Sequence, residues 1–198
     1  PWPPLFGATG AYFGNYNVGK RSVVLDLGNA THRERLWKLV DGADVLLQNL
    51  KPGTLDRLGF THEAMQARNP HLVYCSISGF GARGVRAAAL DTVVQASSGL
   101  MSLVEPAASG EPLNGGFSFA DLIAAHVAPL AILAALDERD RTGKGRFVDT
   151  SMQAGLVWLT QLAWQDGGSA FAEHALLRCS DGWLAAHLQR AEADLTWA

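Results

Sequence analysis

The stretch GGFSFADLIAAHVAPLAILAALDER, residues 115–139, decides how the rest of this 198-residue chain is interpreted. Two glycines and a short loop lead to one carboxylate, Asp121, and an almost wholly apolar run follows. We expect a long buried helix, whose first backbone N–H groups carry positive partial charge and stabilise the carboxylate form. Partial burial acts in the opposite direction and raises basicity and nucleophilicity. Asp121 therefore has two candidate roles, as a helix N-cap and as a catalytic carboxylate.

Apolar runs that are typical of buried strands alternate with amphipathic segments around this helix. The predicted strands are residues 22–27, 44–49, 72–77 and 146–150. This alternation predicts an α/β fold with a parallel, doubly wound (Rossmann-like) sheet. Ligands bind to such sheets beyond the carboxyl ends of the strands.

The helices between these strands have recognisable beginnings. Thr31, with Glu34 three residues later, forms a capping-box pattern. Thr61 is expected to open a second helix. Asp91 is a candidate cap of a third helix, and Gln95 follows four residues later on the same helix face.

The pattern changes after residue 165. Residues 176–180 and 183–187 flank an Asp-Gly pair and predict a hairpin. We therefore expect residues 1–165 to belong to a large α/β domain that binds the ligand, and residues 166–198 to form a linker and the beginning of a small α+β domain. The sequence begins at Pro1 without an initiator Met, and we expect it to be a piece of a longer protein, or a protein whose ends were not recorded.

The composition argues against several classes of partner. The net charge is −3, so the chain lacks the basic surface that nucleic acid or an anionic membrane needs. Cys75 and Cys179 lie far apart and form no metal or redox motif, which fits a reducing cytoplasm. The apolar run of residues 122–136 is too short to span a bilayer.

A glycine-rich loop, GFGARG at residues 79–84, has the letters of a dinucleotide-binding motif. The context of that motif is missing, because no obvious helix opens directly after it. No acid-ended strand follows about 20 residues later either. A nicotinamide site is therefore not expected.

Five blocks, in order along the chain, resemble the class III CoA-transferases, a family that includes formyl-CoA transferase, carnitine CoA-transferase and α-methylacyl-CoA racemase. The blocks are NVGKRS with LDL (17–27), ADV through QNL and PG (43–53), DRLG (56–59), NP through SISGFG (69–81) and residues 91–99. Matches at Asp121, residues 134–136, Arg139, TGKG (142–145) and VD (148–149) follow. The resemblance covers about residues 17–154.

The resemblance implies a nucleophile and a mechanism. Asp121 matches the family's catalytic aspartate, which attacks the thioester carbonyl of an acyl-CoA and gives an enzyme-acyl anhydride and CoA thiolate. The thiolate then forms an aspartyl-CoA thioester, from which an acceptor carboxylate takes over the CoA. Backbone N–H groups of a glycine-rich loop would stabilise the oxyanion. No metal and no permanently bound cofactor are implied, because the CoA thioester is the substrate.

The resemblance also implies residues that bind CoA within the large domain. Lys20 and Arg57 match basic positions near the CoA phosphates. Asn49 and Leu50 match the pair that lines the nucleotide and pantetheine path, with Leu50 in place of the family's Phe.

Asp91 and Gln95 match a polar substrate wall near the nucleophile. The racemase branch has a His immediately before the acid, and this chain has Leu90 there. A two-base racemase needs a second proton carrier, so transfer is favoured over racemisation. A racemase or epimerase, and an inactive CoA-binding fragment, stay open as alternatives. The resemblance further implies a cytoplasmic homodimer of interlocked chains, which acts on an acyl-CoA and a carboxylate.

Overall fold

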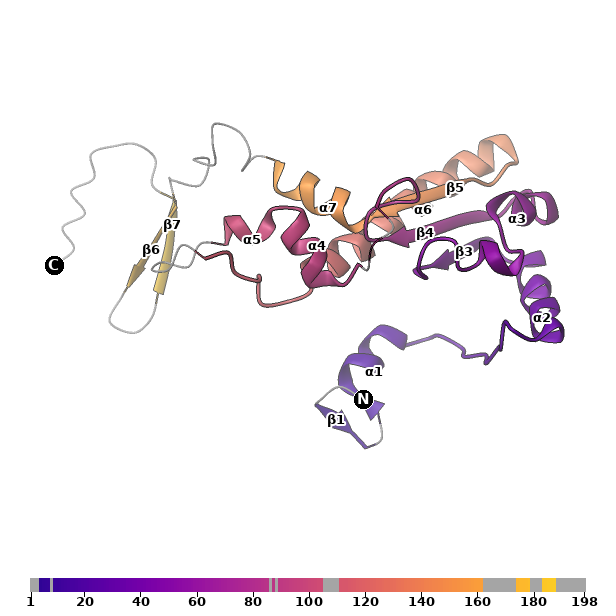
Figure 1. Cartoon of the computed structure of the whole chain (residues 1–198), viewed down its shortest axis with the longest axis horizontal. Helices are drawn as coiled ribbons and strands as arrows, with labels where there is room; N and C mark the ends of the chain where they lie inside the picture. The colour runs from indigo at the N-terminus through magenta and orange to yellow at the C-terminus, as the bar shows by residue number, and fades with distance from the viewer. Residues whose placement is uncertain are drawn as a thin grey trace. The chain divides into compact units, whose positions relative to one another are not determined.

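The computed structural model describes residues 4–7, 9–85, 87, 89–104, 111–161, 174–178 and 183–187. The chain divides into two compact units, Pro1–Asp41 and Gly42–Ala198 (Figure 1). The predicted boundary at residues 165 and 166 stays a prediction.

The N-terminal unit combines a small hairpin with two helices. β1 (Leu5–Phe6) and β2 (Thr9–Gly10) pair antiparallel, and α1 (Ala11–Asn17) follows directly. α2 (Ala30–Asp41) completes the unit.

The strand predicted at residues 22–27 is wrong. This segment pairs with no strand in the described part of the chain, and Val23 and Val24 are 64% and 88% exposed. A β-branched run favours extended backbone, but a strand also needs a neighbour that accepts its backbone hydrogen bonds.

The beginning of α2 also differs from the prediction. The Asn29 side chain accepts a hydrogen bond from the Thr31 backbone N–H at 2.8 Å, so Asn29 caps the helix two residues before the predicted Thr31. Asn is among the strongest N-cap residues, which explains why it takes this position. In contrast, Thr61 caps its helix as predicted, and its side chain accepts from the Ala64 N–H.

A parallel sheet forms the centre of the second unit and confirms the predicted fold class. β3 (Val45–Gln48), β4 (Val73–Ser78) and β5 (Phe147–Ser151) lie in the order β3-β4-β5. The elements between and after these strands are η1 (Asp56–Leu58), α3 (His62–Arg68), α4 (Asp91–Ser97), α5 (Leu100–Leu103), α6 (Phe119–Thr142) and α7 (Met152–Leu159).

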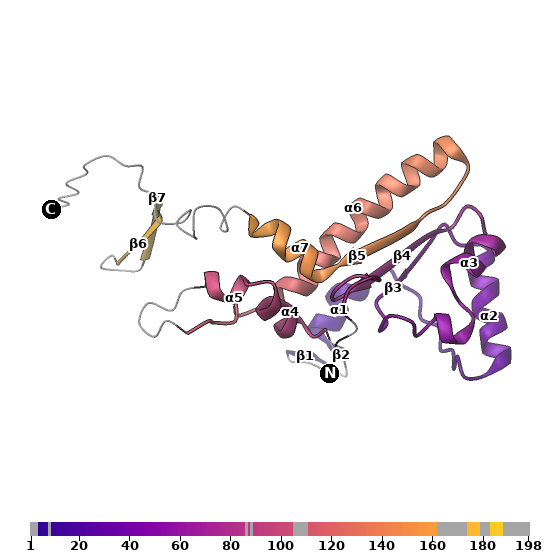
Figure 2. The ribbon, with the colours of Figure 1, turned by 45° about the horizontal axis from the view of Figure 1, so that its top comes forward.

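Helices cover both faces of this sheet. On one face of β4, the Tyr74 ring contacts the rings of His62 on α3 and Phe147 on β5. Ile77 packs on the other face, against a cluster that includes Ala124 of α6. Because alternate side chains of a strand point to opposite faces, α3 and α6 lie on opposite sides of the sheet. Figure 2 shows α6 alongside β4 and β5.

The apolar core lies on the α6 side, around the first turns of that helix. Its buried members come from α4, α5, α6 and α7 and are Val94, Leu100, Ala120, Ala124, Met152 and Leu156. This packing joins the beginning of α6 to α4 and α7, so the segment that carries Asp121 is built into the core.

The helix α6 has 24 residues, and by length and composition alone it could cross a membrane. The prediction concerned the apolar run of residues 122–136, and the helix extends beyond that run at both ends. Its buried residues are alanines, Ala120, Ala124, Ala128 and Ala135. These small side chains let α6 pack closely on β4, β5 and α7, whereas Leu130 and Leu133 on the same helix are exposed.

The far end of α6 is tied to the sheet by an ion pair. The Arg139 guanidinium donates to Asp44 Oδ1 at 2.8 Å, immediately before β3, and the Arg139 side chain is only 18% exposed. Gly143 then ends the helix in the left-handed conformation, with φ of 71°, as the predicted glycine stop requires.

The C-terminal hairpin is confirmed. β6 (His174–Arg178) and β7 (Trp183–His187) pair antiparallel, and β6 begins two residues before the predicted position. Cys179 lies outside the described residues.

Gly145 provides a test of the close packing at the entrance to β5. A Cβ at this position would lie 2.0 Å from the backbone oxygen of Leu72, and the Gly145 N–H donates to the Pro70 oxygen at 2.8 Å. We expect Gly145→Ala to lower the free energy of unfolding by about 3 kcal/mol, because backbone must move to admit the methyl group. Urea denaturation measures the change.

Gly42→Ala is the matched control, because a Cβ at Gly42 meets open space. Its unfolding free energy should change by less than about 1 kcal/mol. Equal stabilities of the two variants would contradict the close approach at Gly145.

Candidate functional site

A cavity of about 470 Å³ lies beyond the carboxyl ends of β3 and β4, where parallel sheets bind ligands. Three segments meet there: the loop after β3, the end of β4 with its glycine-rich loop, and the first turns of α6. The lining residues are Asn49, Leu50, Lys51, Pro52, Ile77, Ser78, Gly79, Ala87, Ala89, Asp121, Ala124, Ala125 and Met152. Three predicted site residues, Asn49, Leu50 and Asp121, are therefore brought together at one cavity.

Asp121 is the third residue of α6 and is not its N-cap. The residue at the N-cap is Ser118, whose side chain makes no capping hydrogen bond. The interpretation of Asp121 as the cap is therefore wrong, although the acid does lie in the first turn.

The carboxylate of Asp91 takes the capping hydrogen bonds instead. Asp91 Oδ1 accepts from the backbone N–H of Ala120 at 2.8 Å and from that of Asp121 at 3.2 Å. The prediction that Asp91 caps its own helix is wrong, because α4 follows Leu90 without a side-chain cap. Asp91 instead reaches from the beginning of α4 to the beginning of α6.

The buried amide of Gln95 fixes this arrangement. Gln95 Nε2 donates to Asp91 Oδ2 at 2.5 Å and to the backbone oxygen of Phe117 at 2.9 Å. Gln95 Oε1 accepts from the Gly115 N–H at 3.2 Å. Neither Asp91 nor Gln95 is among the described residues that line the cavity.

The two glycines before Asp121 meet separate backbone requirements. A Cβ on Gly115 would lie 2.4 Å from the Phe119 ring and 3.4 Å from Gln95 Oε1. Gly116 has φ of 81°, in the left-handed region that favours glycine. The loop therefore approaches Gln95 and then turns into the helix.

The pKa of the Asp121 carboxyl is raised above its ordinary value. The larger cause is burial, which penalises the charged form, and the smaller cause is the like charge of Asp91. This burial is only partial, because Asp121 as a whole is an exposed residue. We expected the helix N-terminus to stabilise the Asp121 anion and so to lower its pKa. This effect is outweighed, because N–H groups of the first turn donate to Asp91 instead.

The loop after β3 is held by Gln48, which the sequence reasoning did not select. Gln48 Oε1 accepts from the Leu50 N–H at 2.7 Å, and its Nε2 donates to Ser76 Oγ at 2.7 Å. These bonds position Asn49 and Leu50 on the cavity wall. Lys51 also lines the wall and was missed, although it directly follows the predicted pair in the sequence.

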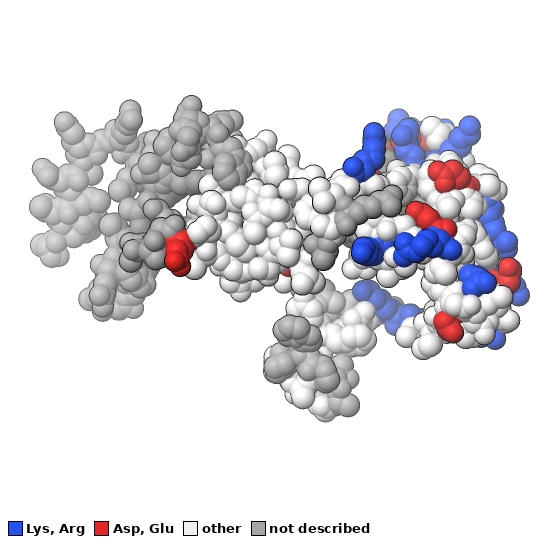
Figure 3. Space-filling view, in the orientation of Figure 1, with Lys and Arg blue, Asp and Glu red and all other residues white. Residues whose placement is uncertain are grey.

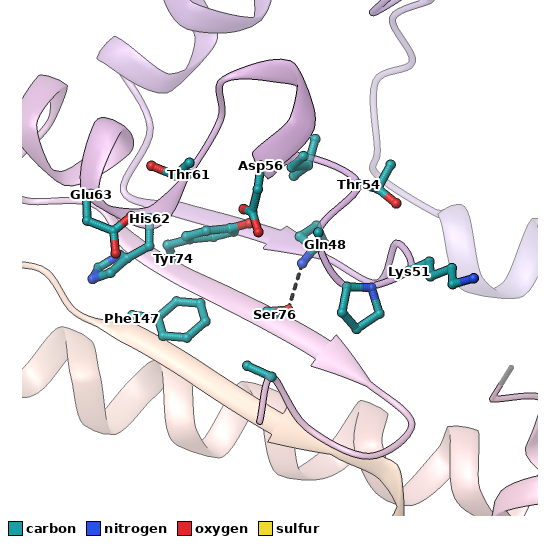
Figure 4. Close-up of a pocket in the computed structure, with 14 residues that line it drawn as sticks. Gln48, Lys51, Thr54, Asp56, Thr61, His62, Glu63, Tyr74, Ser76 and Phe147 are labelled. Carbon is teal, nitrogen blue, oxygen red and sulfur yellow. Dashed lines mark hydrogen bonds between the residues drawn. The ribbon is translucent and has the colours of Figure 1, made fainter. Parts of the chain in front are cut away.

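A second cavity, of about 270 Å³, lies on the α3 face of the sheet and shares Lys51 and Pro52 with the first. Figure 4 shows His62, Tyr74 and Phe147 grouped on one side of it and Lys51 on the other. Arg57 lies next to this cavity, because it donates to Thr54 Oγ1, a lining residue, at 3.4 Å.

Lys20 belongs to the N-terminal unit, where it is exposed after α1. Its proposed contact with CoA stays a prediction. Among the described residues, no group of three or more His, Cys, Asp and Glu side chains could hold a metal ion.

The glycine-rich loop at residues 79–84 uses several of its own N–H groups. Gly81 donates to Ser78 Oγ at 2.9 Å, Ala82 donates to Asp149 Oδ2 at 2.9 Å, and Gly84 donates to the Gly81 oxygen at 3.1 Å. An oxyanion site in this loop would therefore need donors other than these three.

Comparisons with known proteins agree on one family. The family described as CoA-transferase family III matches residues 2–193. The chain is 41% identical over 177 residues to an acetyl-CoA:oxalate CoA-transferase of Acetobacter aceti, which covers 88% of this chain and 42% of that protein. It is 38% identical to a succinyl-CoA:mesaconate CoA-transferase of Haloarcula hispanica, over 78% of this chain and 40% of that protein.

A solved structure gives the same result for the fold. A CAIB/BAIF family protein from Brucella suis aligns with a TM-score of 0.80 and 34% identity, over 92% of this chain and 53% of that one. The chain spans about two fifths of the length of the two curated relatives, those of Acetobacter aceti and Haloarcula hispanica.

The raised pKa of Asp121 predicts how stability depends on pH. The folded chain binds this proton more tightly than the unfolded chain does, so the contribution to stability is complete at low pH and is lost as the pH rises through the folded pKa. We expect Asp121→Asn, which cannot ionise, to raise the melting temperature near pH 7. The gain should shrink as the pH falls toward about 4.

Thermal unfolding of the natural protein and the variant at several pH values measures this gain. Asp137→Asn is the control, because Asp137 is an exposed acid on the same helix. It should show no such gain with rising pH, and a lower melting temperature of Asp121→Asn at pH 7 would contradict the assigned environment.

Proposed function

Because this chain belongs to CoA-transferase family III, we propose that it carries the nucleophile and part of the acyl-CoA site of an enzyme that moves CoA between an acyl-CoA thioester and a carboxylic acid. The observation that carries this proposal is the position of Asp121. Its carboxyl has a raised pKa and lines the same cavity as Asn49 and Leu50.

The first half of the reaction transfers CoA to the enzyme. An Asp121 oxygen attacks the thioester carbonyl, the C–S bond breaks, and a mixed anhydride and CoA thiolate form. The thiolate then attacks the Asp121 carbonyl carbon, which gives an aspartyl-CoA thioester and releases the first carboxylate. Burial and the charge of Asp91 support this role, because an anion that its surroundings stabilise less is the stronger nucleophile.

The second half reverses these steps with another acid. The acceptor carboxylate attacks the aspartyl-CoA carbonyl and releases the thiolate, which then attacks the acceptor's carbonyl in the new anhydride. The acceptor leaves as its CoA thioester and Asp121 is regenerated. Covalent catalysis of this kind divides one difficult exchange into easier steps.

Basic side chains near the cavities suit the phosphates of CoA. Lys51 lies where the two cavities adjoin, and Arg57 lies beside the smaller one. We propose that the pantetheine arm follows Asn49 and Leu50 toward Asp121. Lys51 and Arg57 would then attract the phosphates.

Transfer is favoured over racemisation because, among the described residues that line the cavity, Asp121 is accompanied by no histidine and no second acid. Leu90 stands where the racemase branch has its His. Lys51 and Asp121 are the titratable side chains among the described lining residues. His126 is exposed, and its Nδ1 lies 2.7 Å from the Leu122 oxygen in the preceding turn of α6.

A homodimer in the cytoplasm is part of the same proposal. On the face seen in Figure 3, the surface over α4, α5 and α7 carries few Lys, Arg, Asp or Glu side chains. Trp158 on α7 is 63% exposed, and Val157 and Leu159 beside it are also exposed. An uncharged surface with large apolar side chains fits a contact with another chain. Cys75 is buried and free, which fits a reducing compartment.

Trapping the intermediate tests the proposal. We expect hydroxylamine, added after an acyl-CoA, to convert the Asp121 carboxyl of the natural protein to a hydroxamate that peptide mass spectrometry detects. Asp121→Ala should lower CoA transfer by at least about a thousandfold, because it removes the nucleophile. Asp137→Asn should retain transfer.

Transfer that is unchanged in Asp121→Ala would overturn the proposal. Binding of CoA by the natural protein without transfer would favour the CoA-binding fragment. Exchange of the α-hydrogen of an acyl-CoA for deuterium, without transfer, would favour the racemase.

Lys51 gives a separate test of the CoA path. Lys51→Ala should raise the KM for acyl-CoA by about tenfold while kcat changes by less than about twofold, since a phosphate contact contributes equally to the ground state and the transition state. Steady-state kinetics at several salt concentrations measure both constants. Lys144→Ala, beyond the opposite end of α6, is the control, and an equal effect there would contradict a specific role for Lys51.

A further inference from the structure

Backbone N–H groups in the first turn of α6 donate to a side chain of another helix, α4. Free N–H groups at a helix N-terminus normally stabilise an acid of the first turn as its anion. Here the N–H groups of Ala120 and Asp121 donate to Asp91 Oδ1, at 2.8 and 3.2 Å. The Asp121 carboxylate accepts no hydrogen bond from the residues that the structure describes.

The orientation of Asp91 is itself determined by Gln95. The Gln95 side chain is 0% exposed, so each of its polar atoms needs a partner inside the protein. Its Nε2 faces two acceptors, Asp91 Oδ2 and the Phe117 oxygen, whereas its Oε1 faces the Gly115 N–H. If the Gln95 amide were flipped, its NH2 would face the Gly115 N–H and its oxygen would face the two acceptors. The Gln95 amide therefore has one favourable orientation, and this orientation holds the Asp91 carboxylate in place.

We propose that Asp91, held by Gln95, is a positioning residue for the nucleophile: it takes the backbone donors of the first turn of α6 and leaves the Asp121 carboxylate uncapped on the cavity wall. The inference rests on the proposed function of Asp121. It assigns Asp91 a contact with the nucleophile's own backbone, rather than the contact with substrate that a polar wall would make.

The charged groups around Asp121 are consistent with this role. Asp91 faces it from α4, and Lys51 lies on the cavity wall in the loop after β3. The lining residues from β4 and α7, Ile77, Ser78 and Met152, are not titratable. The like charge of Asp91 contributes to the raised pKa of Asp121, and its hydrogen bonds withhold the donors that would lower that pKa.

The test combines a titration with kinetics on the natural protein and its Asp91→Asn variant. Asn removes the charge, and it has one acceptor oxygen where Asp91 has two. It therefore cannot accept from the two N–H groups and from the Gln95 amide without placing its own NH2 against a donor. Carbon-13 NMR of labelled aspartate carboxyls, assigned with Asp121→Asn, should show the Asp121 titration midpoint move to lower pH in the variant. We expect kcat to fall on the order of tenfold or more, with the KM for acyl-CoA changed by less than about twofold.

Thr92→Ala, at an exposed position next to Asp91, is the matched control and should change neither readout. An unchanged Asp121 midpoint in folded Asp91→Asn would overturn the proposal. A raised KM with an unchanged kcat would also overturn it, because that result would assign Asp91 to the substrate. The titration needs no transfer activity, so failure of the proposed function and failure of this inference give different results.

A measurement on the natural protein alone tests the capping role even if Asp91→Asn does not fold. In the natural protein, the amide protons of Ala120 and Asp121 should exchange with solvent at least about tenfold more slowly than unbonded first-turn amides, because both are hydrogen-bonded. Fast exchange of both amides would contradict the capping role of Asp91, whatever the behaviour of Asp91→Asn.

Discussion

The contact between the Asp91 carboxylate and the first turn of α6 is the constraint on which the candidate site depends. It joins two helices that are separated by 20 or more residues of chain, and it does so at Asp121, the proposed nucleophile. The apolar cluster that includes Val94 and Leu156 supplies most of the packing energy, but apolar contacts do not fix the relative orientation of the helices. The Asp91 carboxylate and the Gln95 amide fix this orientation, because hydrogen bonds tolerate little misalignment.

Three surrounding features follow from this constraint. Gly115 lets the loop pass against Gln95 and Phe119, because a Cβ there would push the Phe119 ring aside. The Asp121 carboxylate faces a cavity between the sheet and α6, close to the loop that Gln48 holds. Its environment combines partial burial, solvent contact and one like charge, which fits the nucleophile proposed above, because that acid must be ionised but not strongly stabilised.

Much of this arrangement could be predicted from the sequence. Short apolar runs at β3, β4 and β5 and a glycine stop at Gly143 are local patterns, and the parallel sheet follows from their alternation with helices. Local patterns failed where a long-range partner decides the outcome. Residues 22–27 have the composition of a strand, yet the described chain offers them no neighbouring strand. Asp91 stands at the beginning of α4, where an aspartate commonly caps its own helix, yet it caps α6, which begins 28 residues later.

The ion pair between Arg139 and Asp44 has a mechanical consequence for the site at the other end of α6. Asp121 and Arg139 are 18 residues apart on one helix, which corresponds to about 27 Å along its axis. With Asp91 at one end and Asp44 at the other, the helix cannot slide by a turn without breaking both attachments. The two attachments thus fix the axial position of α6, so the Asp121 carboxyl can keep a constant position relative to the sheet without a ligand to hold it there.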